Sequence, residues 1–489
     1  MRERKAASAT LFARLGGHIT LKAHADGKIV ASFDHQSVEL GKFSAGAADR
    51  AQDLRVGLPI SSFVPVERAT DKEIDLLARR LARLGLMEYR LAPSRRGEDQ
   101  VVIEPQVPDY WPQVPRLRDS DVVVLSRFAY LRRRGDEMVL ESPRSGALFK
   151  ICNPKIAAAI ATLVTPQPIK QLRQDNSLSV ALLALLVDCQ ILFKVKSAQH
   201  RALRGAEGDH KLVLWDFHDL LFHARSTEGR HANPLGGVYP YAGTLPPPPA
   251  VRPRWPGKKI DLGKFAAEPS LSPTAKLLRE RHSTRGFDGQ RPITLAELSR
   301  FLDSTARVQS RWEAPLDIGD GGPVVAYAAR PYPSGGGSYE LELYLAVDKC
   351  ERLARGYYHY DAGGHVLVPI NARAQEVDAL LTGAEFAMAA PAVPQILITI
   401  TARFERISWK YSSIAYALIL KDVGVLLQTF YLVATEMGLC GCAIGSTNID
   451  LFAKMTGIEF HVEGPVGQFA LGRGLTIPAD EVFKRFRRS

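Results

Sequence analysis

The chain has 489 residues, of which 46% are apolar and 24% charged, with a formal net charge of +11. This length is too great for one hydrophobic core, so two or three domains are expected, and the composition is that of an ordinary soluble protein. The basic charge suits an anionic partner. No basic stripe with interleaved aromatic residues and no zinc-finger spacing occurs, so nucleic acid is not expected to be that partner.

The cysteine content and the apolar segments indicate where the protein acts. Five cysteines are sparse and odd in number, which fits a reducing cytoplasm. Cys440 and Cys442 form a lone pair with no neighbouring histidine, so we expect no metal site. Residues 1–14 are basic without an apolar segment, and the apolar run 180–193 is too short to cross a bilayer. We therefore expect a cytoplasmic protein that does not enter a membrane.

Residues 1–105 form a first block of predicted elements. Residues 19–33 contain a hairpin signal at Asp26-Gly27. Residues 70–84 carry leucine and isoleucine at helical spacing, and Gly85 follows directly, which predicts a helix ending there. A short strand is expected over residues 86–91.

Residues 106–205 repeat this order. A hairpin signal falls within residues 128–141, apolar helices are predicted over 154–163 and 177–187, and a strand over 191–195 closes the block. The order is that of a winged helix-turn-helix, which can bind DNA or clamp a peptide by adding it to a sheet. A purely structural role is the third reading. We favour the peptide clamp for these two winged-helix-like blocks.

Residues 206–269 are interpreted as a connector. The aromatic stretch 215–223 is expected to be packed, and the prolines at 246–249 predict an extended spacer. Beyond it, residues 270–489 alternate between helices and strands, which predicts an α+β domain in which helices flank a sheet.

Four elements of this last domain are well marked. Thr294 and Glu297 form a capping-box pattern for a helix over 295–304. Strands are predicted over residues 339–347 and 396–401, and a long helix over 413–437. That helix is apolar on most sides, which is typical of a core or an interface, and Gly438 is expected to end it.

Two short motifs suggest a flavin site. Arg281, Ser283 and Arg285 lie within five residues, and arginine is suited to gripping a phosphate such as that of FMN. Three consecutive glycines at 335–337 let the backbone approach a flat ligand closely, and the Ser334 hydroxyl beside them can hydrogen-bond a ring edge.

These motifs, taken in order, resemble the FMN-dependent nitroreductase superfamily. The resemblance covers residues 270–489 and rests on Arg281-His282-Ser283-x-Arg285, Pro333-Ser334-Gly335-Gly336, the long helix and a closing Leu471-Gly472. The segments Trp409-Lys410-Tyr411 and Asp422-x-Gly424-x-x-x-Gln428 are similar to those of the SagB/ThcOx-type thiazole/oxazole dehydrogenases. Such enzymes oxidise azolines, which a cyclodehydratase makes from Cys, Ser or Thr of a precursor peptide, to aromatic azoles.

The resemblance implies a role for each matching residue. Arg281, His282, Ser283 and Arg285 would hold the FMN phosphate and ribityl groups, with Gly445 and Arg473 completing the phosphate end; Pro333, Ser334, Gly335 and Gly336 would lie along the isoalloxazine; Gln428 would reach the flavin from the partner subunit of a homodimer; and Lys410 and Tyr411 would form the catalytic pair. His282 stands where the family often has arginine, so its contact is less well defined.

The implied reaction removes a hydride and a proton from adjacent ring carbons. FMN supplies the hydride acceptor, and we expect Tyr411 to accept the proton while Lys410 orients it, although the two roles can be exchanged. No G-x-G-x-x-G pattern marks an NAD(P)H site, so oxygen is the expected final acceptor. Two alternatives stay open: an NAD(P)H-dependent nitroreductase or quinone reductase, and a non-catalytic scaffold subunit of a peptide-modifying synthetase. The expected partners are the precursor peptide and the cyclodehydratase proteins.

Overall fold

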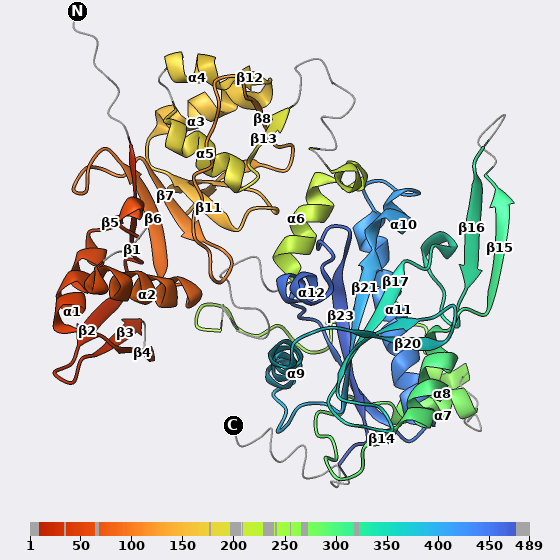
Figure 1. Cartoon of the computed structure of the whole chain (residues 1–489). Helices are drawn as coiled ribbons and strands as arrows, with labels where there is room; N and C mark the ends of the chain where they lie inside the picture. Colours follow the sequence, from red (N-terminus) through yellow and green to blue (C-terminus); the bar gives the residue numbers. More distant parts are fainter. Residues whose placement is uncertain are drawn as a thin grey trace, which may run out of the picture. The chain divides into compact units, whose positions relative to one another are not determined.

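A computed structural model describes residues 9–33, 36–63, 68–175, 178–195, 207, 209–227, 239, 242–254, 256–265, 272–316 and 322–475 (Figure 1). The chain divides into two compact units, Met1–Ala232 and Asn233–Ser489, which are described separately.

The first unit contains two successive sets of elements with the same order. The first set is β1 (Thr10–Leu15), β2 (Thr20–Ala23), β3 (Lys28–Phe33), β4 (Gln36–Lys42), α1 (Ala45–Ala51), β5 (Leu58–Pro59), α2 (Ala69–Arg83), β6 (Met87–Ala92) and, after it, β7 (Val101–Pro105). The second is β8 (Val122–Leu125), β9 (Tyr130–Arg134), β10 (Glu137–Glu141), β11 (Ala147–Ile151), α3 (Pro154–Ala161), β12 (Gln167–Pro168), α4 (Ile169–Asp175), α5 (Val180–Asp188) and β13 (Leu192–Val195). Each set is a strand, a three-stranded meander, a helix, a short strand, further helix and a closing strand.

The strand pairing repeats in part as well. The first strand of each set lies between its short strand and its closing strand, in the orders β5-β1-β6 and β12-β8-β13. The two meanders differ. The sheet β2-β3-β4 leaves β4 at an edge, whereas β11 pairs with β7 within the larger sheet β5-β1-β6-β7-β11-β10-β9. Among the described residues, no strand pairs with the outer edge of β4, whereas β7 pairs with the corresponding edge of β11.

Local sequence signals account for most elements of this unit. The helix predicted over 70–84 is α2, which buries Ile74, Leu77 and Leu81, and Gly85 follows it with φ of 69°. The helix predicted from residue 177 begins only at Val180, because the Ser179 hydroxyl accepts a hydrogen bond from Leu182 N and caps it there. The seven-residue helix α4 was not predicted, since it is too short to show a clear periodicity.

The connector predicted over residues 206–269 contains a helix that belongs to the first unit. This helix, α6 (Phe217–Ser226), begins after Asp216, whose side chain accepts a hydrogen bond from His218 N. Arg225 near its end forms an ion pair with Glu141 at the end of β10. The expectation that 215–223 is packed is confirmed for Leu220, His223 and Trp215, which are buried.

The second unit is built on a six-stranded antiparallel sheet in the order β20-β19-β17-β21-β23-β22. Its strands are β17 (Leu341–Val347), β19 (Gly356–Asp361), β20 (Val366–Ile370), β21 (Ile396–Arg403), β22 (Cys440–Ile444) and β23 (Glu463–Gly472), with two smaller pairs, β14 (Ile293–Thr294) with β18 (Cys350–Glu351) and β15 (Ser310–Pro315) with β16 (Val324–Ala329). Its helices are α7 (Pro273–Glu280), α8 (Leu295–Ala306), α9 (Ala374–Met388), α10 (Phe404–Ser408), α11 (Ala415–Glu436) and α12 (Ile449–Thr456).

Helices cover both faces of this sheet (Figure 1). Successive residues of a strand point to opposite faces, so Phe469 and Ala470 of β23 mark the two sides. Phe469 contacts Phe430 and Tyr431 of α11. Ala470 belongs instead to the apolar cluster that includes α9 and α12. The predicted α+β architecture, a sheet with flanking helices, is confirmed for this unit.

The long helix α11 agrees closely with its prediction. It spans 22 residues and ends just before Gly438, which has φ of 66°. By length and composition alone α11 would be long and apolar enough to cross a membrane, but it packs against β22, β23 and α8. Its outer face exposes Ala417, Gly424 and Gln428.

Candidate functional site

The predicted phosphate-binding motif surrounds one tyrosine of α11. The Tyr431 hydroxyl accepts a hydrogen bond from Ala443 N at 2.8 Å and forms a second hydrogen bond with Ser283 Oγ at 2.7 Å. The Arg281 guanidinium carbon lies 5.0 Å from the centre of the Tyr431 ring, within cation–π range. Tyr431 therefore orients both Arg281 and Ser283.

The remaining residues predicted for the phosphate end have different surroundings. His282 is exposed, and its ring contacts the Glu280 carbonyl at 2.9 Å. Arg285 lies beside Cys442; burial raises the pKa of that thiol, and Arg285 acts against the increase. Gly445 is exposed, with open space where a side chain would be.

Arg473 is held by a carboxylate of the same chain. Its Nη2 lies 2.9 and 2.8 Å from the two carboxylate oxygens of Glu297, the residue that also forms the capping box with Thr294. The Arg473 backbone N–H donates to the buried side chain of Gln395 at 3.1 Å. Arg473 thus links the end of β23 to the start of α8, in addition to any role at a phosphate.

The serine–glycine loop is fastened to the middle of α11. Ser334 Oγ lies 2.9 Å from Asp422 Oδ2, and Gly335 N donates to the same oxygen at 2.7 Å. Asp422 is buried and was recognised in the sequence only as part of a motif. Its carboxylate now explains the position of Ser334 and Gly335. Pro333, just before them, is exposed.

Lys410 and Tyr411 converge on the next residue of this loop. Lys410 Nζ donates to the Gly336 carbonyl at 2.9 Å and lies 5.5 Å from the Tyr411 ring centre. Gly336 has φ of 59°, and a Cβ there would clash with Tyr411 Oη and lie 2.6 Å from Lys410 Nζ. The positive φ favours glycine at this position, and a side chain there would displace the ends of Lys410 and Tyr411.

The loop of residues 334–336 and the arginine motif of residues 281–285 contact different sides of α11. Asp422 holds the loop, and Tyr431 orients the arginine motif. These two residues are nine positions apart. At 100° per residue this is a rotation of roughly 180° about the helix axis. One chain thus presents the loop on one face of α11 and the arginine motif on the other. Gln428 is exposed on the same helix.

Two residues of this region were missed in the sequence. Tyr431 is a hydroxyl-bearing residue in an apolar helix, and only its contacts reveal a role. Glu340 directly precedes the apolar strand β17 and is fully buried, with its Oε2 3.2 Å from Ser334 Oγ. A charged residue at the start of such a strand was the available signal, because buried carboxylates are rare without a partner.

The first unit has a groove between β4 and α2. Val38 and Leu40 of β4 line one side, and Arg80, Arg83 and Leu84 line the other, around a volume of about 400 Å³. Among the described residues β4 is an edge strand, and of its outward backbone groups the Leu40 carbonyl accepts a hydrogen bond from Arg80 of α2.

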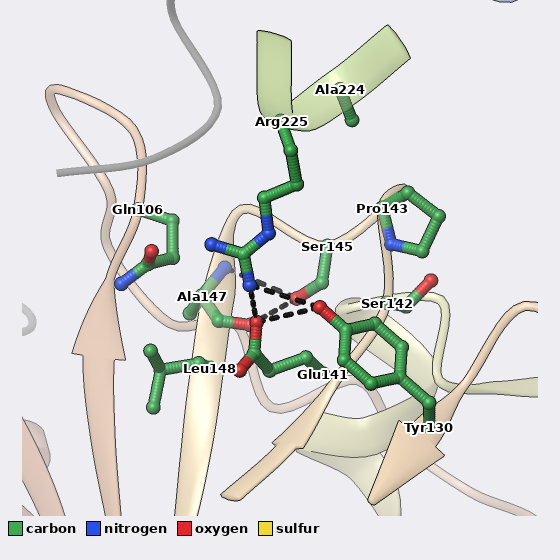
Figure 2. A pocket seen from close by; sticks show the side chains of 10 residues that line it. All are labelled: Gln106, Tyr130, Glu141, Ser142, Pro143, Ser145, Ala147, Leu148, Ala224 and Arg225. Carbon is green, nitrogen blue, oxygen red and sulfur yellow. Dashed lines mark hydrogen bonds and ion pairs between the residues drawn. The ribbon is translucent and has the colours of Figure 1, made fainter. Parts of the chain in front are cut away.

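A second concavity, beneath α6, is filled by an ion-pair network (Figure 2). The Glu141 carboxylate accepts a hydrogen bond from Tyr130 Oη at 2.8 Å and also contacts Arg225 of α6. Arg132 of β9 pairs with its other oxygen at 2.5 Å. These contacts neutralise a buried carboxylate and fasten α6 to the sheet, which is a structural role.

Comparison with known families matches a part of each unit. Residues 278–473 match the nitroreductase family, and residues 123–232 match the family described as cyanobactin oxidase ThcOx. The first range covers the six-stranded sheet with its helices, and the second covers β8 through α6. The chain therefore contains a ThcOx-type domain and a nitroreductase-family domain, and its C-terminal unit has the nitroreductase fold.

Individual relatives were also found. The chain is 28% identical over 170 residues to a nitroreductase-type protein of Methanocaldococcus jannaschii, covering 35% of this chain and 77% of the relative. Among solved structures, the Escherichia coli microcin synthetase McbBCD complex with truncated pro-MccB17 bound matches at 18% identity and a TM-score of 0.38, covering 58% of this chain and 100% of the other. A nitroreductase-type protein of Desulfovibrio desulfuricans in complex with FMN matches at 12% identity and a TM-score of 0.26, covering 43% and 95%.

Proposed function

We propose a function that starts from the two family matches, which support an oxidoreductase with a peptide-modifying role. We propose more specifically that the chain is an FMN-dependent dehydrogenase that oxidises thiazolines or oxazolines of a precursor peptide to azoles. The observation that carries this proposal is the convergence of Lys410 and Tyr411 on Gly336 of the glycine loop. An ammonium and a phenol at a surface free of side chains suit proton removal from a flat ring.

The residues present fit FMN chemically. Gly337 has open space at its Cβ position and Gly336 is exposed, so a planar ring can approach this backbone. Ser283 and Arg281, oriented by Tyr431, offer a hydroxyl and a guanidinium to a phosphate, and Arg285 adds a second cation nearby in the sequence. These groups would hold the two ends of the cofactor.

The chain's own residues have separate tasks in this proposal. When bound, FMN supplies the acceptor for a hydride from the azoline ring. Tyr411 Oη receives the proton from the adjacent ring carbon. Lys410, held by the Gly336 carbonyl, lies beside the Tyr411 ring and orients it.

We propose that the active form is a homodimer. The loop and the arginine motif lie on opposite faces of α11, so a second copy is required if both are to contact one flavin. The outer face of α11, with Ala417, Gly424 and Gln428, is the surface that this pairing would cover. A molar mass of one chain, measured by light scattering at micromolar concentration with FMN bound, would exclude a shared site.

We propose that the groove between β4 and α2 binds the precursor peptide as an added strand. The internal repeat supplies the reason, because at the equivalent strand β11 the edge is filled by the antiparallel strand β7. Among the described residues that line the groove, Arg80 donates to the Leu40 carbonyl, Arg83 pairs with Asp109 at 3.1 Å, and Glu39 pairs with Lys28 at 3.2 Å. Arg80 has no carboxylate partner in the part of the chain that the structure describes, so it is the charge that would favour an acidic segment. ThcOx is described as an oxidase of cyanobactins, which agrees with a peptide substrate.

The direct test is a reaction with a synthetic peptide that carries one thiazoline. The proposal predicts that the FMN-loaded protein removes two hydrogen atoms from it in air, visible by mass spectrometry. An unchanged peptide together with rapid oxidation of NADPH in the presence of a quinone would favour a quinone reductase instead. A protein that binds no FMN would favour the scaffold role.

A further inference from the structure

The loop that carries Gly336 is held by two carboxyl groups that compete for too few protons. Ser334 Oγ lies 2.9 Å from Asp422 Oδ2 and 3.2 Å from Glu340 Oε2. A hydroxyl has one proton, so it can donate to only one of the two carboxyl groups. The same oxygen already accepts a hydrogen bond from Tyr339 N at 2.9 Å. One further proton is needed if both carboxyl groups are to be hydrogen-bonded.

Because both carboxyl groups are buried, a state in which both are ionised is unfavourable. Glu340 is fully buried, and its Oε1 has no hydrogen-bond donor among the described residues. Asp422 is 6% exposed and receives a hydrogen bond from Gly335 N at 2.7 Å. Two adjacent buried carboxylates repel each other, and the usual result is that one of them stays protonated.

We propose that Glu340 and Asp422 share one proton, and that this carboxyl pair positions residues 334–336 and, through the Gly336 carbonyl, Lys410. The effect on catalysis rests on the proposed function, whereas the shared proton itself does not. With the proton in place, Glu340 donates to Asp422, and Asp422 in turn accepts from Ser334 Oγ and Gly335 N. Both are therefore positioning residues.

The electrostatic surroundings agree with this arrangement. Burial raises the pKa of Glu340 to about 7; the charge of Asp422 and a hydrogen bond to it act in the same direction, and hydrogen bonds from the Glu340 backbone and from Ser334 act against the increase. From the segment before the loop, the buried Tyr332 faces the pair; burial raises its pKa, so it stays neutral. Arg330 and Glu342 lie beside Tyr332 and pair with each other at 3.3 Å.

The sign of the pH effect follows from this raised pKa. The unfolded chain releases the Glu340 proton near pH 4.5, whereas the folded chain keeps it until about pH 7. Between these values the folded state binds more protons, so stability falls as pH rises, and the contribution is lost above the folded pKa. Above it, two charges face each other across Ser334, and their repulsion weakens the attachment of the loop to α11.

The test compares the wild type with Glu340→Gln, whose amide can donate to Asp422 at any pH. We would titrate FMN into each protein from about pH 6 to about pH 9, a range that spans the expected transition. The wild-type Kd should rise about tenfold or more with pH, and that of Glu340→Gln by less than about threefold. The exposed Glu351→Gln should retain the wild-type profile. Identical profiles in wild type and Glu340→Gln would overturn the proposal.

A second measurement keeps the inference testable if the variant does not fold or the protein binds no FMN. The infrared spectrum of the cofactor-free wild type should contain the carbonyl band of a buried carboxylic acid at about pH 6, which disappears as the pH passes about 7. Absence of that band at about pH 6 would overturn the shared proton. Neither this readout nor FMN affinity depends on azoline oxidation, so failure of the proposed reaction would be recognised separately.

Discussion

Replacing Gly336 by alanine tests the arrangement of the catalytic pair. Its φ of 59° is unfavourable for alanine, and the new Cβ would clash with Tyr411 Oη and lie 2.6 Å from Lys410 Nζ. The backbone conformation alone should lower stability by about 1–2 kcal/mol. The new Cβ would also displace Lys410 and Tyr411 from their positions. A shift of about 1 Å at a reacting group can reduce the rate about 100-fold.

The neighbouring Gly337 is the matched control. It has φ of 68°, so alanine there meets a similar backbone penalty, but its Cβ position is open. Thermal unfolding should therefore show similar destabilisation for both variants, whereas turnover of a thiazoline peptide should fall about 100-fold more for Gly336→Ala. Equal turnover in the two variants, with equal FMN content, would refute the role assigned to the space around Gly336.

Four further substitutions test the site and the β4 groove. Lys410→Ala and Tyr411→Phe should each reduce azoline oxidation by about 100-fold or more while FMN stays bound, and full turnover in both would remove the pair from the mechanism. Arg281→Ala should weaken FMN binding about tenfold, as measured by flavin fluorescence, because one charged contact to phosphate is lost; unchanged affinity would place the phosphate elsewhere. Arg83→Glu, at the rim of the β4 groove, should weaken binding of an acidic peptide severalfold in a salt-dependent manner, and an unaltered Kd would argue against this groove.

Elements with a local signal were predictable from the sequence. The capping box of Thr294 and Glu297 places the start of α8 correctly, and Gly85 and Gly438 follow the ends of α2 and α11. These features depend on backbone groups within a few residues, so a single sequence contains the information. The two similar blocks were also visible as a repeated order of elements.

Features that depend on distant residues were not predictable. The pairing of β7 with β11 joins the two blocks into one sheet, and no local pattern specifies it. Tyr431 meets Ser283 across 148 residues of sequence. Asp422 and Ser334 are 88 residues apart, so the buried pair with Glu340 emerges only when α11 packs against the loop. The sequence motifs identified the Arg281 motif and the Ser334 loop, and the fold showed that Tyr431 and Asp422 orient them.

The most direct measurement is an anaerobic titration of the FMN-loaded protein with a thiazoline peptide, followed by visible absorption. The account predicts that the oxidised flavin band bleaches in proportion to the azoline added, that one azole forms per flavin reduced, and that air restores the band. An oxidised band that persists with excess peptide, while NADPH bleaches it at once, would contradict azoline oxidation as the function of this site.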